Sequence, residues 1–172
     1  TAVILEVLGN PSKYPIMTSN TDNVYWYFPG TAPDQEIWFQ SMGTVTGGVK
    51  LSGWRMQQPI IDALQNNNDP RLSVYADKNS WGKYSGHRFG PLELSDTLNN
   101  NFNRSHIGDW FMNDPKGFVP YMNSAEVYFC LAEIYQRGLA TGVAKTAYET
   151  GITKSCEESG KINAASIATF LT

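Results

Sequence analysis

The sequence predicts a mainly α-helical protein that carries long irregular loops. Residues 123–172 place apolar side chains at helical spacing between capping residues. Residues 1–122 are instead rich in Gly, Pro, Asn and Ser with scattered aromatic residues, a composition typical of turns and loops. With 41% hydrophobic and 17% charged residues, the chain has enough apolar surface to bury. We therefore expect a loop-rich segment over 1–122 and a helical segment over 123–172.

Charge and hydropathy argue against nucleic-acid binding and against a membrane-spanning helix. The 172 residues carry a formal net charge of −3 and no basic run, which gives no electrostatic basis for binding nucleic acid. No apolar stretch reaches the ~18 residues of a membrane-spanning helix. The chain begins at Thr1 rather than at a methionine, and a helical pattern is still running at Leu171. We therefore expect a piece of a longer protein.

One helix is predicted within the loop-rich segment, over residues 59–66. Pro59 suits the first turn of a helix, because the missing N–H has no partner there. Ile60, Ile61 and Leu64 fall on one face at helical spacing, and a run of Asn residues then favours a stop. Only short helical or extended pieces fit the rest of the segment.

The helical segment opens with a well-marked helix. Asn123 can cap its first turn, with Glu126 placed to complete a capping box. Arg137 and Gly138 make a conventional stop. The apolar residues that follow helical spacing between these ends are Val127, Tyr128, Leu131, Ile134 and Tyr135.

A second helix is expected from near Thr141 to Gly160, and a third opens at Asn163. The first two match the tetratricopeptide repeat signature at Tyr128, Leu131, Ala132, Tyr135, Ala144 and Tyr148. Small side chains at Ala132 and Ala144 would let two antiparallel backbones approach. One repeat cannot bury its own apolar face, so neighbouring repeats are expected. An ordinary helical hairpin is the alternative.

Aromatic residues in turn-rich surroundings are the candidate ligand contacts. A sugar ring stacks its apolar face on an aromatic ring, while amides and hydroxyls bond its rim. The candidates are Trp81, Tyr84, Trp110 and Trp26, with Asn79, Asn99, Asn100, Asn101 and Asn103 as polar partners. The alternative is that these rings anchor loops to the body of the protein. Trp38 and Trp54 are assigned to packing.

Neither a catalytic site nor a metal site is predicted. The acidic residues are dispersed, whereas acid–base chemistry needs two carboxylates brought together. His87 and His106 are lone histidines in polar loops, and a zinc site needs three or four convergent ligands. Asp69 before Pro70 is interpreted as a turn former, with Arg71 pairing with it or clamping a carbonyl. We expect no enzyme activity and no cofactor.

The order of short motifs along the chain carries a family resemblance. The segments are SNTDN at 19–23, NDPRL at 68–72, NSAEVYF at 123–129, LAE at 131–133 and GI at 151–152. Over residues 14–160 this succession resembles the SusD/RagB superfamily, in the subgroup described as starch-binding, outer-membrane-associated lipoproteins.

The resemblance implies tetratricopeptide-like repeats with both segments in one larger domain. It also implies a non-catalytic, surface-exposed lipoprotein of the cell outer membrane that captures starch or other glycans or, in some members, peptides. A SusC-like TonB-dependent transporter is the implied partner, over which the protein acts as a lid. The leader peptide and lipidated cysteine are expected in the longer protein. A helical-repeat scaffold that binds only proteins is the alternative, which the long aromatic loops disfavour.

Overall fold

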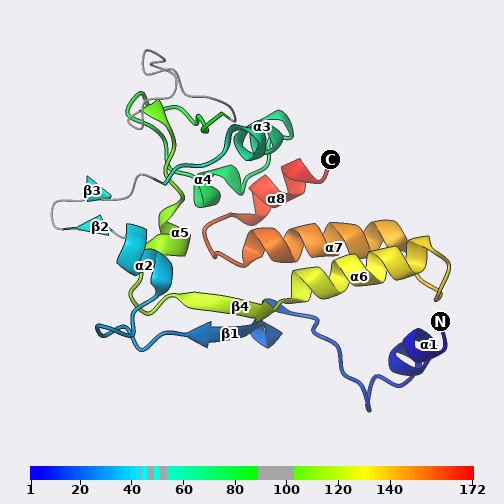
Figure 1. The fold of residues 1–172 in the computed structure, drawn as a ribbon. Coiled ribbons are helices and arrows are strands. Elements are labelled where there is room, and N and C mark those ends of the chain that lie inside the picture. Colours follow the sequence, from blue (N-terminus) through cyan, green and yellow to red (C-terminus); the bar gives the residue numbers. More distant parts are fainter. Residues whose placement is uncertain (43, 46–48, 51–53, 89–102) are drawn as a thin grey trace. The chain divides into compact units, whose positions relative to one another are not determined.

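The computed structural model describes residues 1–42, 44–45, 49–50, 54–88 and 103–172 (Figure 1). The elements are α1 (Ala2–Gly9), the 3-10 helix η1 (Asn20–Asp22), β1 (Val24–Tyr27), α2 (Ile37–Met42), β2 (Thr44–Val45), β3 (Val49–Lys50), α3 (Gln58–Asn66), α4 (Leu72–Tyr75), α5 (Asp109–Met112), β4 (Phe118–Met122), α6 (Ser124–Gln136), α7 (Ala144–Glu157) and α8 (Ala164–Phe170). The mainly α-helical prediction is confirmed, and short elements joined by long loops fill the first two thirds of the chain.

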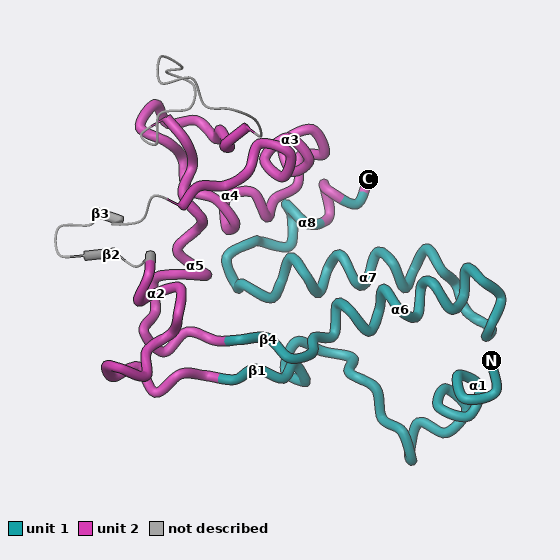
Figure 2. Tube along the Cα trace, in the orientation of Figure 1, with its two compact units in different colours: residues 1–26, 119–167, 171 teal, residues 27–118, 168–170, 172 magenta. Residues whose placement is uncertain are grey.

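The chain forms two compact units (Figure 2). The first contains residues 1–26, 119–167 and 171, and the second contains 27–118, 168–170 and 172. The first 26 residues thus group with the helix pair rather than with the rest of the loop-rich segment. β1 pairs with β4, and β2 pairs with β3 as an antiparallel ribbon.

The helix pair α6–α7 forms the core of the first unit. The side chain of Asn123 accepts the N–H of Glu126 at 2.9 Å, as the sequence predicts for its cap. Gly138 ends α6 with φ +66°, a left-handed conformation that glycine adopts without strain. Between these ends, Leu131 and Ala132 are buried against Ala147 of α7. Leu8 of α1 and the side chains of Val127, Tyr128 and Tyr135 pack against this cluster.

Small residues allow the close approach of α6 and α7. The sequence predicts Ala132 and Ala144 for this role, and the structure places Ala132 and Ala147 in the core, with Ala144 partly buried. Gly151 contributes a second close approach, since a Cβ there would lie 2.8 Å from the ring of Phe129. The antiparallel pair predicted from the repeat signature is therefore present, and Ala147 and Gly151 of α7 add small-residue contacts that the sequence prediction did not include.

The 19–23 segment (SNTDN) fastens the ends of both helices. The amide of Asn20 donates to the carbonyl of Lys154 in α7 at 2.9 Å, and its Oδ1 accepts the Ser124 hydroxyl at 2.7 Å. The Ser124 N–H donates to Oδ1 of Asn23, also at 2.7 Å. Ser19 and Asp22 form a reciprocal capping box within the segment. This stretch of the family pattern thus serves the fold.

The 68–72 segment (NDPRL) turns the chain from α3 into α4 in the second unit. Buried Asp69 accepts the backbone N–H of Arg71 and its Nε, both at 2.9 Å. The predicted turn and the predicted Asp69–Arg71 pair are both present. In α3, Ile61 and Leu64 are buried as expected, whereas Ile60 is 44% exposed.

Candidate ligand-binding loop

The loop 77–88 in the second unit is held at both ends by backbone hydrogen bonds to other segments. At its start, the Asp77 N–H donates to the carbonyl of His106 at 3.0 Å. At its end, the His87 N–H donates to the carbonyl of Met56 at 2.6 Å, and the His87 carbonyl accepts the Gln58 N–H at 2.7 Å. The middle of the loop can therefore project while both ends stay fixed.

A buried asparagine closes the turn at the tip of this loop. Asn79 is only 9% exposed, and its Oδ1 accepts the N–H groups of Trp81 and Lys83, each at 3.0 Å. Its own N–H donates to the Lys83 carbonyl at 2.8 Å, and its Nδ2 donates to the Asn103 carbonyl at 3.0 Å. Side-chain capping of this kind is how Asn fixes a turn. Asn79 thus builds the turn from within.

Trp81 lies at the tip of this turn and is 58% exposed. Gly82 follows it with φ +72°, which a side chain would strain. Because the backbone of the turn is already fixed, a ligand that binds the indole does not have to order the loop beneath it.

Tyr84 is partly buried on the same loop, and Lys78 Nζ lies 5.9 Å from the centroid of its ring. Burial, with a smaller contribution from the Asp77 carboxylate, raises the pKa of the Tyr84 hydroxyl above its ordinary value of 10.0. The hydroxyl therefore stays protonated at neutral pH and keeps a proton to donate.

The other two predicted contacts lie elsewhere. Trp110 is partly buried on α5, where its ring packs on Phe111 and Phe118 with centroids 4.7 and 5.3 Å away. Trp26 is 59% exposed on β1, in the first unit. The structure thus brings Trp81 and Tyr84 onto one loop, and the described ring contacts join neither of them to Trp110.

Some sequence assignments near the loop change with the structure. Asn79, expected to face a ligand, is buried in the turn. Trp38 and Trp54, assigned to packing, are 47% and 65% exposed, so that assignment is wrong. The polar candidates Asn99, Asn100 and Asn101 lie outside the described residues. The local sequence signal for this turn is Asn79 followed by Gly82, since Asn and Gly are both typical turn residues.

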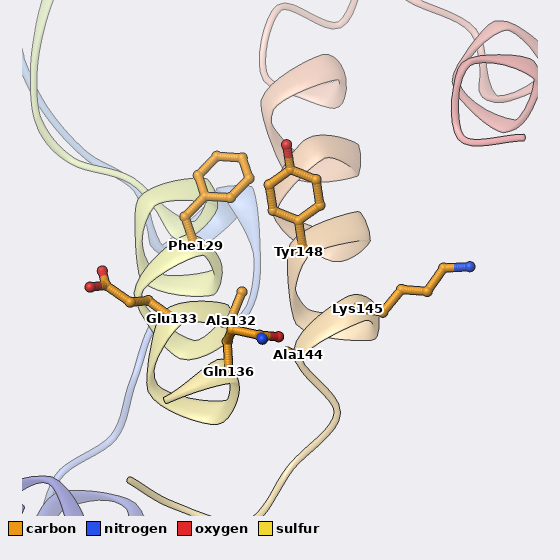
Figure 3. Close-up of a pocket in the computed structure, with 7 residues that line it drawn as sticks. All are labelled: Phe129, Ala132, Glu133, Gln136, Ala144, Lys145 and Tyr148. Carbon is orange, nitrogen blue, oxygen red and sulfur yellow. The ribbon is translucent and has the colours of Figure 1, made fainter. Parts of the chain in front are cut away.

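A groove of about 510 Å³ lies between α6 and α7 (Figure 3). It is lined by Phe129, Ala132, Glu133, Gln136, Ala144, Lys145 and Tyr148. The rings of Phe129 and Tyr148 lie next to each other, 5.6 Å apart, while Glu133 and Lys145 extend away from the helices. This apolar surface fits the sequence expectation that neighbouring repeats cover one face of the pair.

The described residues contain no group of three or more His, Cys, Asp or Glu side chains that could hold a metal ion. Among the described helices, none is long and apolar enough to cross a membrane.

Comparison with known proteins gives matches of family and of fold. Residues 2–172 match the SusD-like family model described as starch-binding associating with outer membrane. Among curated proteins, none matches the chain. A SusD homologue from Bacteroides fragilis superposes with a TM-score of 0.70 at 24% identity, covering 95% of this chain and 39% of its own.

Two further solved structures have the same fold. A SusD homologue from Bacteroides vulgatus has a TM-score of 0.70 at 22% identity, covering 98% of this chain and 33% of its own. A chitin-binding SusD homologue from Flavobacterium johnsoniae has a TM-score of 0.64 at 24% identity, covering 95% and 34%. The chain thus spans between 33% and 39% of the length of these three structures.

Proposed function

The chain belongs to the SusD-like family, and we propose that it is part of a non-catalytic protein that captures glycans at the cell surface. Members of this family are described as starch-binding and associated with the outer membrane. The family assignment agrees with the resemblance in the sequence. The chitin-binding structural relative supports a glycan as the ligand class.

The observation that carries the proposal for this chain is that the loop 77–88 exposes the indole of Trp81 on a closed turn. The indole is 58% exposed, and the turn beneath it is closed by Asn79. An aromatic face that is already in place offers a sugar ring a stacking surface without the cost of ordering a loop. Tyr84 adds a second ring and a protonated hydroxyl on the same loop. Binding residues commonly lie on such loops, held by a rigid scaffold.

The longer protein is proposed to act with a partner in the membrane. We assign it a lipid anchor at the cell outer membrane and a SusC-like TonB-dependent transporter, to which it delivers starch or another oligosaccharide. The family description supports the membrane association. The groove between α6 and α7 is assigned to packing against further repeats rather than to the ligand.

A binding experiment on the full-length protein tests this function. Glycan and peptide libraries are screened, and affinities for the best ligand are measured for the wild type and for Trp81→Ala. We expect glycan binding that weakens tenfold or more, equal to about 1.4 kcal/mol, in Trp81→Ala. The melting temperature should stay close to that of the wild type, because an exposed side chain contributes little stability.

Controls separate the competing functions. Trp54→Ala removes an equally exposed indole in the same unit and should leave affinity unchanged. Trp26→Ala tests the exposed indole of β1 for a separate contribution. Peptide binding without glycan binding would favour peptide capture, and binding only to folded proteins would favour a scaffold. A large stability loss in Trp81→Ala with unchanged affinity would show that Trp81 anchors its loop.

A further inference from the structure

The Trp81 loop carries an excess of positive charge. Lys78, Lys83 and Arg88 are all exposed there, although the whole chain has a net charge of −3. One carboxylate, Asp77, lies in the same loop beside Tyr84. Buried Arg104 donates to the hydroxyl of Ser85 in the same loop.

Lys78, Lys83 and Arg88 differ in their partners from five other cations of the described chain. Elsewhere, cations form ion pairs with carboxylates in the pairs Lys13–Glu6, Arg71–Asp69, Arg137–Glu133, Lys145–Glu149 and Lys154–Glu157. Within the described residues, no carboxylate lies in ion-pair contact with Lys78, Lys83 or Arg88. Their charge is therefore available to a ligand.

Two of the cations, Lys78 and Lys83, flank Trp81 along the chain, at the two ends of the turn. Because the Asn79 N–H donates to the Lys83 carbonyl at 2.8 Å, the chain enters and leaves the turn side by side. Lys78 and Lys83 lie at these two points, and Trp81 lies at the tip between them. Lys78 Nζ also lies near the ring of Tyr84, at 5.9 Å from its centroid.

From this arrangement we infer that the ligand of the Trp81 loop is an anionic glycan, a sugar chain that bears carboxylate or sulfate groups. The inference rests on the proposed glycan-binding function and adds the charge of the ligand. A sugar ring stacks on the indole, and its acidic substituent pairs with the ammonium groups beside it. Lysine suits this role as a mobile point charge with three donors. Exposed charges act through water, so this contribution weakens as salt rises.

The test uses the full-length protein and an array of carboxylated, sulfated and neutral glycans. We expect the bound glycans to be anionic, and the array identifies which acidic group is preferred. Oligogalacturonate and its methyl ester, and heparin oligosaccharides and their desulfated forms, are then compared in solution. For the preferred type, we expect the charged form to bind at least tenfold more tightly at low salt and the preference to shrink at high salt.

A matched pair of double variants assigns the effect to the loop. Lys78→Gln with Lys83→Gln should weaken binding of the charged form at least fivefold while leaving the neutral form unchanged. Lys13→Gln with Lys161→Gln removes the same charge from exposed positions in the first unit, and should change neither affinity by more than twofold.

Other outcomes would overturn the inference in distinguishable ways. Equal affinity for charged and neutral forms, with binding still lost in Trp81→Ala, would refute the anionic ligand and leave glycan capture standing. Binding of peptides but of no glycan would refute the proposed function as well. Lysine-dependent binding to phosphatidylglycerol vesicles without anionic glycan binding would show that the loop meets a lipid surface instead.

Discussion

The helix pair α6–α7 and the loop 77–88 are stabilised by different kinds of contact. In the pair, apolar residues at helical spacing meet across one interface, as Leu131 and Ala132 do with Ala147. In the loop, single polar groups bond segments that are distant in sequence. Asn79 binds the carbonyl of Asn103, for example. One region therefore depends on periodic packing and the other on individual hydrogen bonds.

The motifs shared with the family serve the fold rather than the candidate ligand site. Their residues go into the fold, since Asn20 fastens the helix ends, Asp69 and Arg71 form a turn, and Asn123 caps α6. The exposed Trp81 lies outside these motifs. A fold held in this way allows loops between its motifs to carry different ligand chemistry.

The largest expected effect is on the free energy of unfolding, and it differs between two tryptophans of the second unit. Truncating a buried Trp to Ala typically costs ~3–5 kcal/mol, and Trp110 is partly buried against two rings, so we expect Trp110→Ala to cost about 3 kcal/mol. Trp81→Ala should cost less than about 0.5 kcal/mol. Chemical denaturation of both full-length variants measures the difference. A neutral Trp110→Ala that abolishes ligand binding would instead restore Trp110 to the ligand site.

The helical segment was predictable because its signals are local. Caps at Asn123 and Asn163 and the stop at Gly138 all appear where the sequence places them. The second helix begins at Ala144, later than expected from Thr141. The intervening chain contains Gly142, whose missing side chain makes room for the ring of Tyr135. A contact between separate elements decided that boundary, and spacing along one helix could not predict it.

The loop-rich segment was less predictable because its contacts are long-range. Sequence composition identified Trp81 and Tyr84 as candidates but could not separate exposed rings from packed ones, as Trp54 and Trp110 demonstrate. The α1 helix was not predicted, and its apolar sequence lacks a side-chain cap. Burial of Asn79 depends on the carbonyl of Asn103, which no local pattern reveals.

Overpacking the helix pair should lower stability without affecting the ligand loop. Ala132 is buried at 8% exposure between the helices, so Ala132→Leu should lower the free energy of unfolding by about 1–3 kcal/mol. Ligand affinity should be unchanged, since the substitution leaves the Trp81 loop intact. Denaturation of the full-length protein provides the measurement, with Ala63→Leu at an exposed position of α3 as the control. If both variants are equally stable, the assigned register of the helix pair is wrong.

Substitution of Asn79 should lower both the stability of the protein and its affinity for the ligand, whereas Ala132→Leu should lower stability alone. Asn79→Ala removes the acceptor for Trp81 and Lys83 and the donor to Asn103, so we expect a stability loss of about 1–2 kcal/mol. Affinity should fall as well, because the backbone that presents the indole is no longer fixed. Asn79→Asp keeps the acceptor and loses the donor, and should retain more affinity than Asn79→Ala. Stability and affinity are measured on the same full-length samples, and unchanged affinity in Asn79→Ala would show that the turn does not preorganise Trp81.

The smallest expected effect is a pH dependence of the melting temperature that arises from Asp22 in the first unit. The backbone N–H groups of Thr18 and Ser19 donate to Asp22 Oδ2 at 2.9 and 3.0 Å, and they lower the pKa of that carboxyl below 3.8. A carboxyl whose pKa is lower in the folded state stabilises the fold above its unfolded value. That contribution is lost as the pH falls through the lower folded value.

The Asp22→Asn variant isolates this charge, because the amide keeps an acceptor oxygen for the two N–H groups. At pH 7 the full-length variant should melt slightly below the wild type, and the gap should close as the pH falls below 3.8. Melting temperatures across the acid range measure the gap, and binding of the glycan ligand at pH 7 should be the same in both proteins. A gap that stays constant down to pH 2 would mean that the two N–H groups contribute through hydrogen-bond geometry alone, and that the charge of Asp22 adds nothing to the segment that fastens α6 and α7.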